Sequence, residues 1–293
     1  LSVLTPFFRD DPTALMAALD REAGALAGAV ELVLLDDAGG DPALSARAEA
    51  AVAHMRLPTR LIRLEANAGR APGRNRLAAE ARGRHLLFLD SDMAPDRPDF
   101  LQRWLELARE DVPAAVGGFT LDQARPAPGQ RLHHALQLRA ECLPAAARAL
   151  QPEKYVFTSN LLVRRDVLAA EPFDEGFAGW GWEDVEWGVR VAARHGVRHV
   201  DNSASHLGLD SAAALLSKYE GSAANFGRLA ARHPEMVARY PSHRVARWIR
   251  RLPARGALRA ALRRLALDER APLLARVFAA KTFRAAVYAE VVR

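Results

Sequence analysis

The chain has 293 residues, half of them hydrophobic, a net charge of +6 and one cysteine, Cys142. That length suffices for one large α/β domain, or for a catalytic domain with a smaller appendage. A single cysteine excludes an internal disulfide and a zinc site built from several cysteines, and it fits a reducing compartment. No apolar run reaches the roughly 18 to 20 residues that cross a bilayer, so we expect a cytoplasmic protein.

The basic residues are arginines, apart from three lysines at positions 154, 218 and 281. Because a guanidinium group can bind two oxygens at once, this composition suits phosphate recognition. Nucleotide phosphates, anionic lipid and nucleic acid are all candidate partners, and charge alone does not choose among them.

Short apolar runs alternate with helical patterns along the first two thirds of the chain. The patterns predict strands at residues 2–7, 30–35, 60–65, 86–89, 114–121, 157–163 and 197–202. They predict helices at residues 13–27, 42–55, 73–82 and 99–110. This alternation favours a Rossmann-like, mostly parallel sheet flanked by helices, with right-handed crossovers. Residues 122–153 are expected to form loops and a helix across the mouth of the site.

Two carboxylates follow the most apolar of these strands, in the sequence Asp90-Ser91-Asp92. Open α/β sheets bind ligands at the carboxyl ends of their strands. If the chain stays extended there, alternation points Asp90 and Asp92 the same way. Two neighbouring carboxylates repel each other, and a hard divalent cation shared with substrate phosphates relieves that repulsion.

A second group of functional residue types occupies residues 179–188, which contain three tryptophans, three glycines and three acids. Glycines let the backbone approach a ligand closely, and an exposed indole offers a sugar ring a flat surface. Glu183 and Asp184 are predicted to begin a helix, where the positive end of its dipole favours a carboxylate. Such a carboxylate beside a bound hydroxyl group could act as a general base.

His206 follows the last predicted strand and could bring an imidazole to the same edge of the sheet as Asp92. The two side chains together predict a two-residue metal site.

Five segments taken together resemble the family 2-type glycosyltransferases with the GT-A fold. They are residues 2–6, 31–37, 67–75, 90–92 and 179–186. The last segment is similar to the Trp-Gly-x-Glu-Asp motif of galactosyltransferase-like and chondroitin-polymerase-like members. The resemblance covers roughly residues 1–210, and Trp182 departs from it because a small residue often precedes Glu-Asp there.

On the donor side, the resemblance implies a nucleotide-sugar site. Thr5 and Pro6 would line the base pocket, and Asp37 would accept a hydrogen bond from the uracil imide. Asn67 and Arg74 would lie beside the diphosphate, and Asn160 would line the donor sugar pocket.

The DxD motif of Asp90, Ser91 and Asp92 would complete the donor site. Asp90 would contact the ribose, while Asp92 and His206 would bind Mn²⁺ or Mg²⁺ between the two phosphates.

On the acceptor side, Asp184 would deprotonate the attacking hydroxyl group, and the anomeric configuration would invert. Glu183 would hold a sugar hydroxyl. Trp180, Gly181 and Trp182 would shape the acceptor site.

Simpler readings stay open for each of these residues. Asp37 could belong to a helix-capping turn, and Asp90 and Asp92 to a solvated loop. Glu183 or Glu186 could be the base in place of Asp184. His206 could be a structural histidine.

The C-terminal part, residues 236–293, is expected to form a basic helical extension of a catalytic domain at residues 1–235. Within that domain, residues 1–120 would bind the nucleotide sugar and residues 121–235 the acceptor. Eight arginines between positions 244 and 264 lie among apolar residues at helical spacing. Such helices can lie on an anionic membrane surface, here the inner face of the plasma membrane, or simply pack on the catalytic domain.

The sequence thus predicts a metal-dependent, inverting glycosyltransferase that uses a nucleotide sugar, with a UDP-sugar favoured. Its acceptor would be a saccharide, a lipid-linked sugar or a natural product, as in bacterial polysaccharide biosynthesis. A retaining transferase or a nucleotidyltransferase on a similar fold is the alternative. A nucleic-acid-binding protein is a remote one, because it leaves residues 179–188 unexplained, and no nucleic-acid partner is expected.

Overall fold

The structure is a computed structural model that describes residues 1–26 and 28–292. The chain forms two compact units. The first consists of Leu1–Ala124, Glu141–Gly176 and Asp184–Gly208. The second consists of Arg125–Ala140, Phe177–Glu183 and Leu209–Arg293. The predicted boundary at residue 235 separates a catalytic domain from an extension and does not describe these two compact units, so it stays a prediction.

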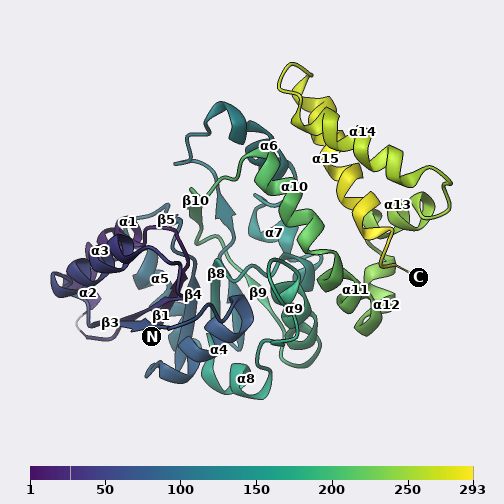
Figure 1. Ribbon diagram of the computed structural model, residues 1–293. Helices are drawn as coiled ribbons and strands as arrows, with labels where there is room; N and C mark the ends of the chain where they lie inside the picture. Colours follow the sequence, from purple (N-terminus) through teal and green to yellow (C-terminus); the bar gives the residue numbers. More distant parts are fainter. Residues whose placement is uncertain (27, 293) are drawn as a thin grey trace. The chain divides into compact units, whose positions relative to one another are not determined.

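A seven-stranded sheet with the order β3-β2-β1-β4-β8-β6-β9 forms the centre of the first unit (Figure 1). Its strands are β1 Ser2–Phe7, β2 Glu31–Asp36, β3 Thr59–Arg63, β4 His85–Leu89, β6 Ala114–Val116, β8 Asn160–Arg164 and β9 Arg198–His199. Neighbouring strands are parallel except β8, which runs antiparallel to both β4 and β6. The predicted mostly parallel, Rossmann-like sheet is confirmed.

The two faces of this sheet are covered by different helices, as the alternation of side chains along β4 shows. Leu87 and Leu89 pack into a core with α1, α3 and α5, whereas Leu86 and Phe88 pack into a second core with α4, α8 and α9. The helices of the first unit are α1 Thr13–Asp20, α2 Ala23–Leu26, α3 Pro42–Ala53, α4 Arg70–Glu80, α5 Phe100–Arg109, α7 Ala145–Arg148, η2 Pro152–Tyr155, α8 Arg165–Ala170 and α9 Glu183–Arg194. The first residue of α9, Glu183, belongs to the second unit. Because β4 is buried on both faces, its continuous apolar run is explained.

A small three-stranded sheet with the order β5-β10-β7 also belongs to the first unit. Its strands are β5 Met93–Pro95, β7 Phe119–Thr120 and β10 Ala204–His206. β5 begins directly after Asp92, and β10 ends on His206, opposite Met93. This sheet therefore carries one predicted metal ligand, His206, and the other, Asp92, lies directly before it.

The helix predicted at residues 13–27 is wrong in extent. Helix α1 ends at Asp20, and the chain bends so that the Glu22 carboxylate accepts hydrogen bonds from the backbone of Leu101 and Gln102 in α5. A long-range helix-capping contact thus interrupts a locally helical pattern. Ala27 lies outside the described residues.

The strand predicted at residues 114–121 is also wrong, because it is two strands in different sheets. β6 ends at Val116 and β7 begins at Phe119. At Gly117 a Cβ atom would collide with Trp104 and with the Asn202 carbonyl, and Gly118 has a φ of +74°. The pair of glycines permits a change of direction that a side chain would block.

The second unit is helical. Its helices are η1 Pro128–Gln130, α6 Arg131–Ala140, α10 Ala212–Gly221, α11 Ala223–Arg232, α12 Pro234–Ala238, α13 Pro241–Ile249, α14 Arg255–Leu267 and α15 Leu273–Tyr288. The predicted helical C-terminal extension is present, and Pro253 and Pro272 lie between its helices, where a proline interrupts no helical hydrogen bond. Within the ranges 1–26 and 28–292, no helix has both the length and the apolar character that a membrane span needs.

Candidate active site

The predicted DxD motif lies where the central strand β4 ends. The strand stops at Leu89, and Asp90-Ser91-Asp92 form a turn in which the backbone N–H of Met93 donates to the Asp90 carbonyl. The alternation argument for Asp90 and Asp92 is therefore wrong, because the chain is not extended there. The two carboxylates have different cationic partners instead.

Asp92 faces His206, and the two side chains form a close pair. Asp92 Oδ2 lies 3.2 Å from His206 Nε2, and the Asp92 carbonyl accepts a hydrogen bond of 2.9 Å from the backbone N–H of Leu207. Burial alone would raise the pKa of Asp92, but the hydrogen bond and charge of His206 outweigh it and hold the pKa below its ordinary value. Burial would likewise lower the pKa of His206, yet Asp92 raises it. The structure thus brings together the two predicted metal ligands.

Space beside this pair depends on Gly208. A Cβ atom at that position would collide with the Asp92 carboxylate. The ring of Phe119 packs edge-on against His206 with centroids 5.8 Å apart, which fixes the imidazole from the other side. The pair therefore lies in a closely fitted site.

The small sheet that holds this pair is cross-linked by the Asp96 side chain, one residue beyond β5. Its carboxylate accepts hydrogen bonds from Thr120 in β7, from Ser203 and Ser205 in or beside β10, and from Gln123. These bonds are 2.6–3.0 Å long. One carboxylate thus ties all three short strands together.

Asp90 pairs with arginines of helix α4. Its Oδ1 lies 2.6 Å from Arg74 Nη2, and its Oδ2 lies 3.8 Å from Arg70 Nη2. The Arg74 side chain is 1% exposed, so its guanidinium is held by the protein beside the strand end. Ser91, between the two carboxylates, is buried.

Asp37 organises the loop before α4. Its carboxylate accepts hydrogen bonds from the Asn67 side chain and from the backbone N–H groups of Ala68 and Gly69, at 2.7–3.1 Å. Burial raises the pKa of Asp37, and the nearby charge of Asp36 adds to the effect, while the two backbone hydrogen bonds oppose it. The predicted residues Asp37 and Asn67 are therefore in direct contact.

Thr5 and Pro6 lie in β1, next to β2. Thr5 is fully buried, and its Oγ1 has no hydrogen-bond partner within the described ranges. Pro6 is half-buried.

Glu183 and Asp184 begin helix α9, as predicted. Asp184 is half-buried, and its Oδ1 accepts a 2.8 Å hydrogen bond from the backbone N–H of Val185. Glu183 is buried, with an exposure of 1%. Of the two carboxylates, Asp184 is the more accessible, as a base for a bound hydroxyl group must be.

Trp180, Gly181 and Trp182 belong to the second unit. Trp182 has a φ of +77°, and its Nε1–H donates a 3.0 Å hydrogen bond to the Tyr288 hydroxyl. Its ring lies 5.0 Å from that of Phe226. Trp182 thus anchors its loop in an aromatic cluster, and a non-glycine residue with positive φ is characteristic of a functional loop.

Trp180 is half-buried and has a different environment. Its ring centroid lies 6.0 Å from Lys218 Nζ and 6.3 Å from the ring of Tyr219. Lys218 in turn pairs with Asp210 at 2.7 Å. Trp180 thus lies beside a charged pair, and its role at the acceptor site stays a prediction.

Asn160 is fully buried at the start of β8. Its Nδ2 donates to the carbonyls of Gly118 and Asn202, at 2.9 and 2.8 Å. This contact fixes the glycine turn, and the donor-sugar role of Asn160 stays a prediction.

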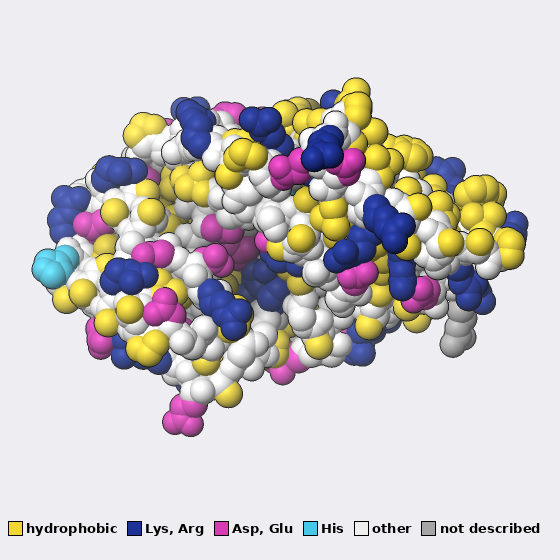
Figure 2. Space-filling model, turned by 45° about the horizontal axis from the view of Figure 1, so that its top comes forward, with side chains coloured by type: hydrophobic (Ala, Val, Ile, Leu, Met, Phe, Trp, Pro, Cys, Tyr) yellow, Lys and Arg dark blue, Asp and Glu magenta, His cyan; other side chains and the backbone are white. Residues whose placement is uncertain are grey.

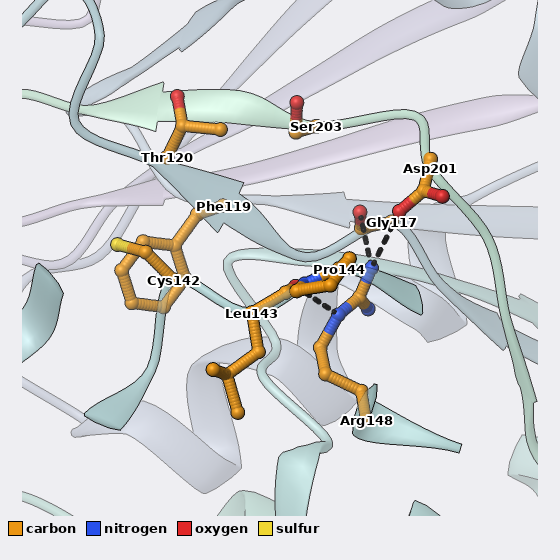
Figure 3. A pocket seen from close by; sticks show the side chains of 9 residues that line it. All are labelled: Gly117, Phe119, Thr120, Cys142, Leu143, Pro144, Arg148, Asp201 and Ser203. Carbon is orange, nitrogen blue, oxygen red and sulfur yellow. Dashed lines mark hydrogen bonds and ion pairs between the residues drawn. The ribbon is translucent and has the colours of Figure 1, made fainter. Parts of the chain in front are cut away.

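A small pocket of ≈ 140 Å³ lies next to that turn in the first unit. Figure 3 shows the Arg148 guanidinium at its edge, bonded to the carbonyls of Gly117 and Leu143 and near Asp201. Burial lowers the pKa of Arg148. Arg148 binds backbone carbonyls, so its role is to join segment 141–148 to the sheet.

Three residues of this site were not predicted: Asp96, Phe119 and Gly208. Asp96 and Phe119 act through contacts between segments distant in sequence, which no local pattern encodes. For Gly208, its position two residues after His206 was a readable signal.

The residues present fit a divalent cation. A carboxylate oxygen suits Mg²⁺ or Mn²⁺, and an imidazole nitrogen favours a transition ion, here Mn²⁺. Over the described part of the chain, no group of three or more His, Cys, Asp or Glu side chains could hold a metal ion. Two protein ligands leave coordination positions for substrate phosphates and water, which is how Mg²⁺-type sites are commonly completed.

A family model described as Glycosyl transferase family 2 matches residues 2–170 of the chain. No curated protein matches the chain significantly.

Several solved structures share the fold. A mannosyltransferase from Pyrobaculum calidifontis, in complex with GDP-Man and Mn²⁺, has a TM-score of 0.56 and 17% identity, and the match covers 99% of this chain and 86% of that one. TarS 1-349 from S. aureus has a TM-score of 0.53 and 16% identity, with 97% and 88% covered. Glucosyl-3-phosphoglycerate synthase from Mycobacterium tuberculosis, in complex with Mn²⁺, UDP-Glc and phosphoglyceric acid, has a TM-score of 0.52 and 19% identity, with 78% and 79% covered. At these identities the likeness shows the fold alone.

Proposed function

Because the chain belongs to glycosyl transferase family 2 and is therefore a glycosyltransferase, we propose that it moves a sugar from a nucleotide sugar to an acceptor hydroxyl group with inversion. The observation that carries this proposal is the Asp92–His206 pair, with its oxygen and nitrogen 3.2 Å apart at the end of the central strand. The proposed donor is a UDP-sugar. The proposed acceptors are a saccharide, a lipid-linked sugar or a small natural product, as in polysaccharide biosynthesis in bacteria.

On the donor side, Asp92 and His206 would hold Mn²⁺ or Mg²⁺. When bound, the cation would neutralise charge on the leaving diphosphate. Arg74 holds the Asp90 carboxylate at 2.6 Å, and Asp90 would accept a hydrogen bond from a ribose hydroxyl group. The remaining donor contacts are proposed for Thr5, Pro6, Asp37, Asn67, Ser91 and Asn160, with Arg74 also beside the diphosphate.

Asp37 needs no rearrangement to bind a base. Its carboxylate already accepts from Asn67, Ala68 and Gly69, yet each carboxylate oxygen can accept more than one hydrogen bond. An imide N–H could therefore be added without breaking the loop.

On the acceptor side, Asp184 would take the proton of the attacking hydroxyl group. It stands in the first turn of α9, where the helix dipole stabilises its charged form. Glu183 would hold a sugar hydroxyl group, and Trp180, Gly181 and Trp182 would shape the acceptor site. In this proposal residues 1–120 would bind the nucleotide sugar, residues 121–235 would bind the acceptor, and residues 236–293 would form an extension. The enzyme would be cytoplasmic and peripheral to the plasma membrane.

What the similar structures bind supports this proposal only by analogy. Two of them contain Mn²⁺, one with GDP-Man and the other with UDP-Glc. A donor screen by thermal shift with UDP-, GDP- and dTDP-sugars, with and without Mn²⁺, would identify the nucleotide.

The mechanism is tested by Asp184→Asn. We expect this variant to bind donor and Mn²⁺ like the wild type but to lose turnover by at least about a hundredfold, the scale of general-base catalysis. Asp166→Asn, which removes an exposed carboxylate paired with Arg164, is the matched control and should be fully active. Near wild-type turnover in Asp184→Asn would reject the base assignment. NMR of the product anomer distinguishes inversion from retention, the alternative mechanism.

A further inference from the structure

The segment from Pro241 to Leu267, which spans helices α13 and α14, has an extreme charge composition. It contains eight arginines and no aspartate or glutamate, although the net charge of the whole chain is only +6. The rest of the chain is therefore slightly acidic. A surface on which all the net positive charge is concentrated fits a polyanionic partner.

Part of this charge is used inside the second unit. Arg259 pairs with Glu290 at 2.6 Å, and Arg250 donates to the Val292 carbonyl at 2.6 Å. By contrast, Arg244, Arg247 and Arg251 are exposed and make no ion pair with any residue in the ranges 1–26 and 28–292. These three arginines are available to an external anion.

The same side of α13 also exposes apolar side chains. Trp248 is 61% exposed and Val245 is 40% exposed, while Ala246 and Ile249 are buried. Positions 244, 247 and 248 follow the helical spacing of three and four residues, so they share one side of α13, and Arg251 lies in the turn directly after the helix. Figure 2 shows hydrophobic side chains (yellow) beside Lys and Arg side chains (dark blue) toward the right of this view.

We propose that this face of α13 and of the turn after it, formed by Arg244, Val245, Arg247, Trp248 and Arg251, docks the enzyme on the anionic headgroups of a membrane. Arginines near such a surface are attracted to phosphate groups, and tryptophan is enriched at the boundary between headgroups and acyl chains. A free anion or the phosphate backbone of a nucleic-acid duplex would account for the arginines but not for an exposed indole among them. A lipid surface accounts for both.

The proposal is tested by co-sedimentation of the full chain with phosphatidylcholine vesicles, with and without phosphatidylglycerol. We expect binding only to the anionic vesicles, weakened at high salt. Each arginine near the surface contributes about a fivefold gain in partition, so replacing Arg244, Arg247 and Arg251 together by alanine should reduce binding on the order of a hundredfold.

A matched variant removes the same charge from another surface. Arg21, Arg82 and Arg109 are exposed residues of the first unit, and their joint replacement by alanine should leave vesicle binding unchanged. A second measurement is fluorescence: the wild type should show a blue shift on addition of anionic vesicles, and Trp248→Phe should lose that shift. Circular dichroism confirms that each variant is folded.

Three results would overturn the proposal. One is the absence of binding to anionic vesicles at low salt. Another is an equal loss of vesicle binding in both triple variants, which would show that binding depends on the net charge of the protein and not on this face. The third is salt-dependent binding to duplex DNA without binding to vesicles, which would assign the surface to nucleic acid.

Discussion

The Asp96 side chain is predicted to set the register of the small sheet and, through it, the position of His206. The strands of this sheet have only two or three residues, so their backbone pairing specifies register weakly. A slip of one residue in β10 would replace His206 by Ser205 or Leu207 and turn the side chains to opposite faces. The four hydrogen bonds to Asp96 act against such a slip.

The perturbation is Asp96→Ala, compared with Asp96→Asn. Each hydrogen bond to a charged group contributes about 1.5–3 kcal/mol, but the donors can bond partly to one another, so we expect a loss of about 3 kcal/mol in the free energy of unfolding. Thr120 and Ser205, for example, are already 2.9 Å apart. A misplaced ligand should raise the Kd for Mn²⁺ by about 10- to 100-fold, as loss of outer-sphere partners does elsewhere. Asp96→Asn retains an acceptor and should lose less.

The assay is Mn²⁺ titration followed by electron paramagnetic resonance, together with urea unfolding. Asp99→Ala, which removes an exposed carboxylate paired with Arg97 and Arg103, is the control and should bind Mn²⁺ normally. If wild type binds Mn²⁺ and folded Asp96→Ala binds it equally well, the register argument is refuted. If wild type does not bind Mn²⁺, the assignment of Asp92 and His206 is itself refuted.

Three further predictions follow from local geometry. His206 has a raised pKa, so its ion pair with Asp92 stabilises the metal-free protein below pH 6.5, and this stabilisation is lost as the pH rises through the raised pKa. The affinity for Mn²⁺, measured by titration across this pH range, should increase with pH because the metal binds the neutral imidazole. Burial raises the pKa of the Cys142 thiol to about 12, so iodoacetamide should not modify it at neutral pH in the folded protein, as mass spectrometry can check. Trp182→Ala should lower the free energy of unfolding by about 3 kcal/mol or more. Trp182→Phe should lower it less, because it loses mainly the hydrogen bond to Tyr288. Equal losses for the two variants in denaturant unfolding would contradict the conclusion that the Trp182 ring anchors its loop.

Much of the fold could be predicted because its signals are local. The apolar run that became β4 is buried on both faces, and the acidic turns after β2 and β4 lie at strand ends, as expected. A contact between Asp92 and His206 could be predicted because each residue lies at or after the end of a strand, at the same edge of the fold.

The errors have tertiary causes. Helix α1 ends at Asp20 although the sequence continues a helical pattern, because Glu22 caps a different helix. Likewise, residues 114–121 form two strands because Trp104 and Asn202 occupy the space beside Gly117. The partners of Trp182, Phe226 and Tyr288, also lie far from it in the sequence, and no local pattern predicts them; its role at the acceptor site stays a prediction.

Gly208 has a consequence for how this enzyme tolerates mutation. Any other amino acid adds the Cβ atom that would collide with the Asp92 carboxylate, so every missense change of this codon disturbs the same group, whatever its chemistry. No substitution there is conservative, not even alanine. The pattern His-x-Gly is thus the local sequence requirement for keeping the Asp92–His206 geometry of this structure.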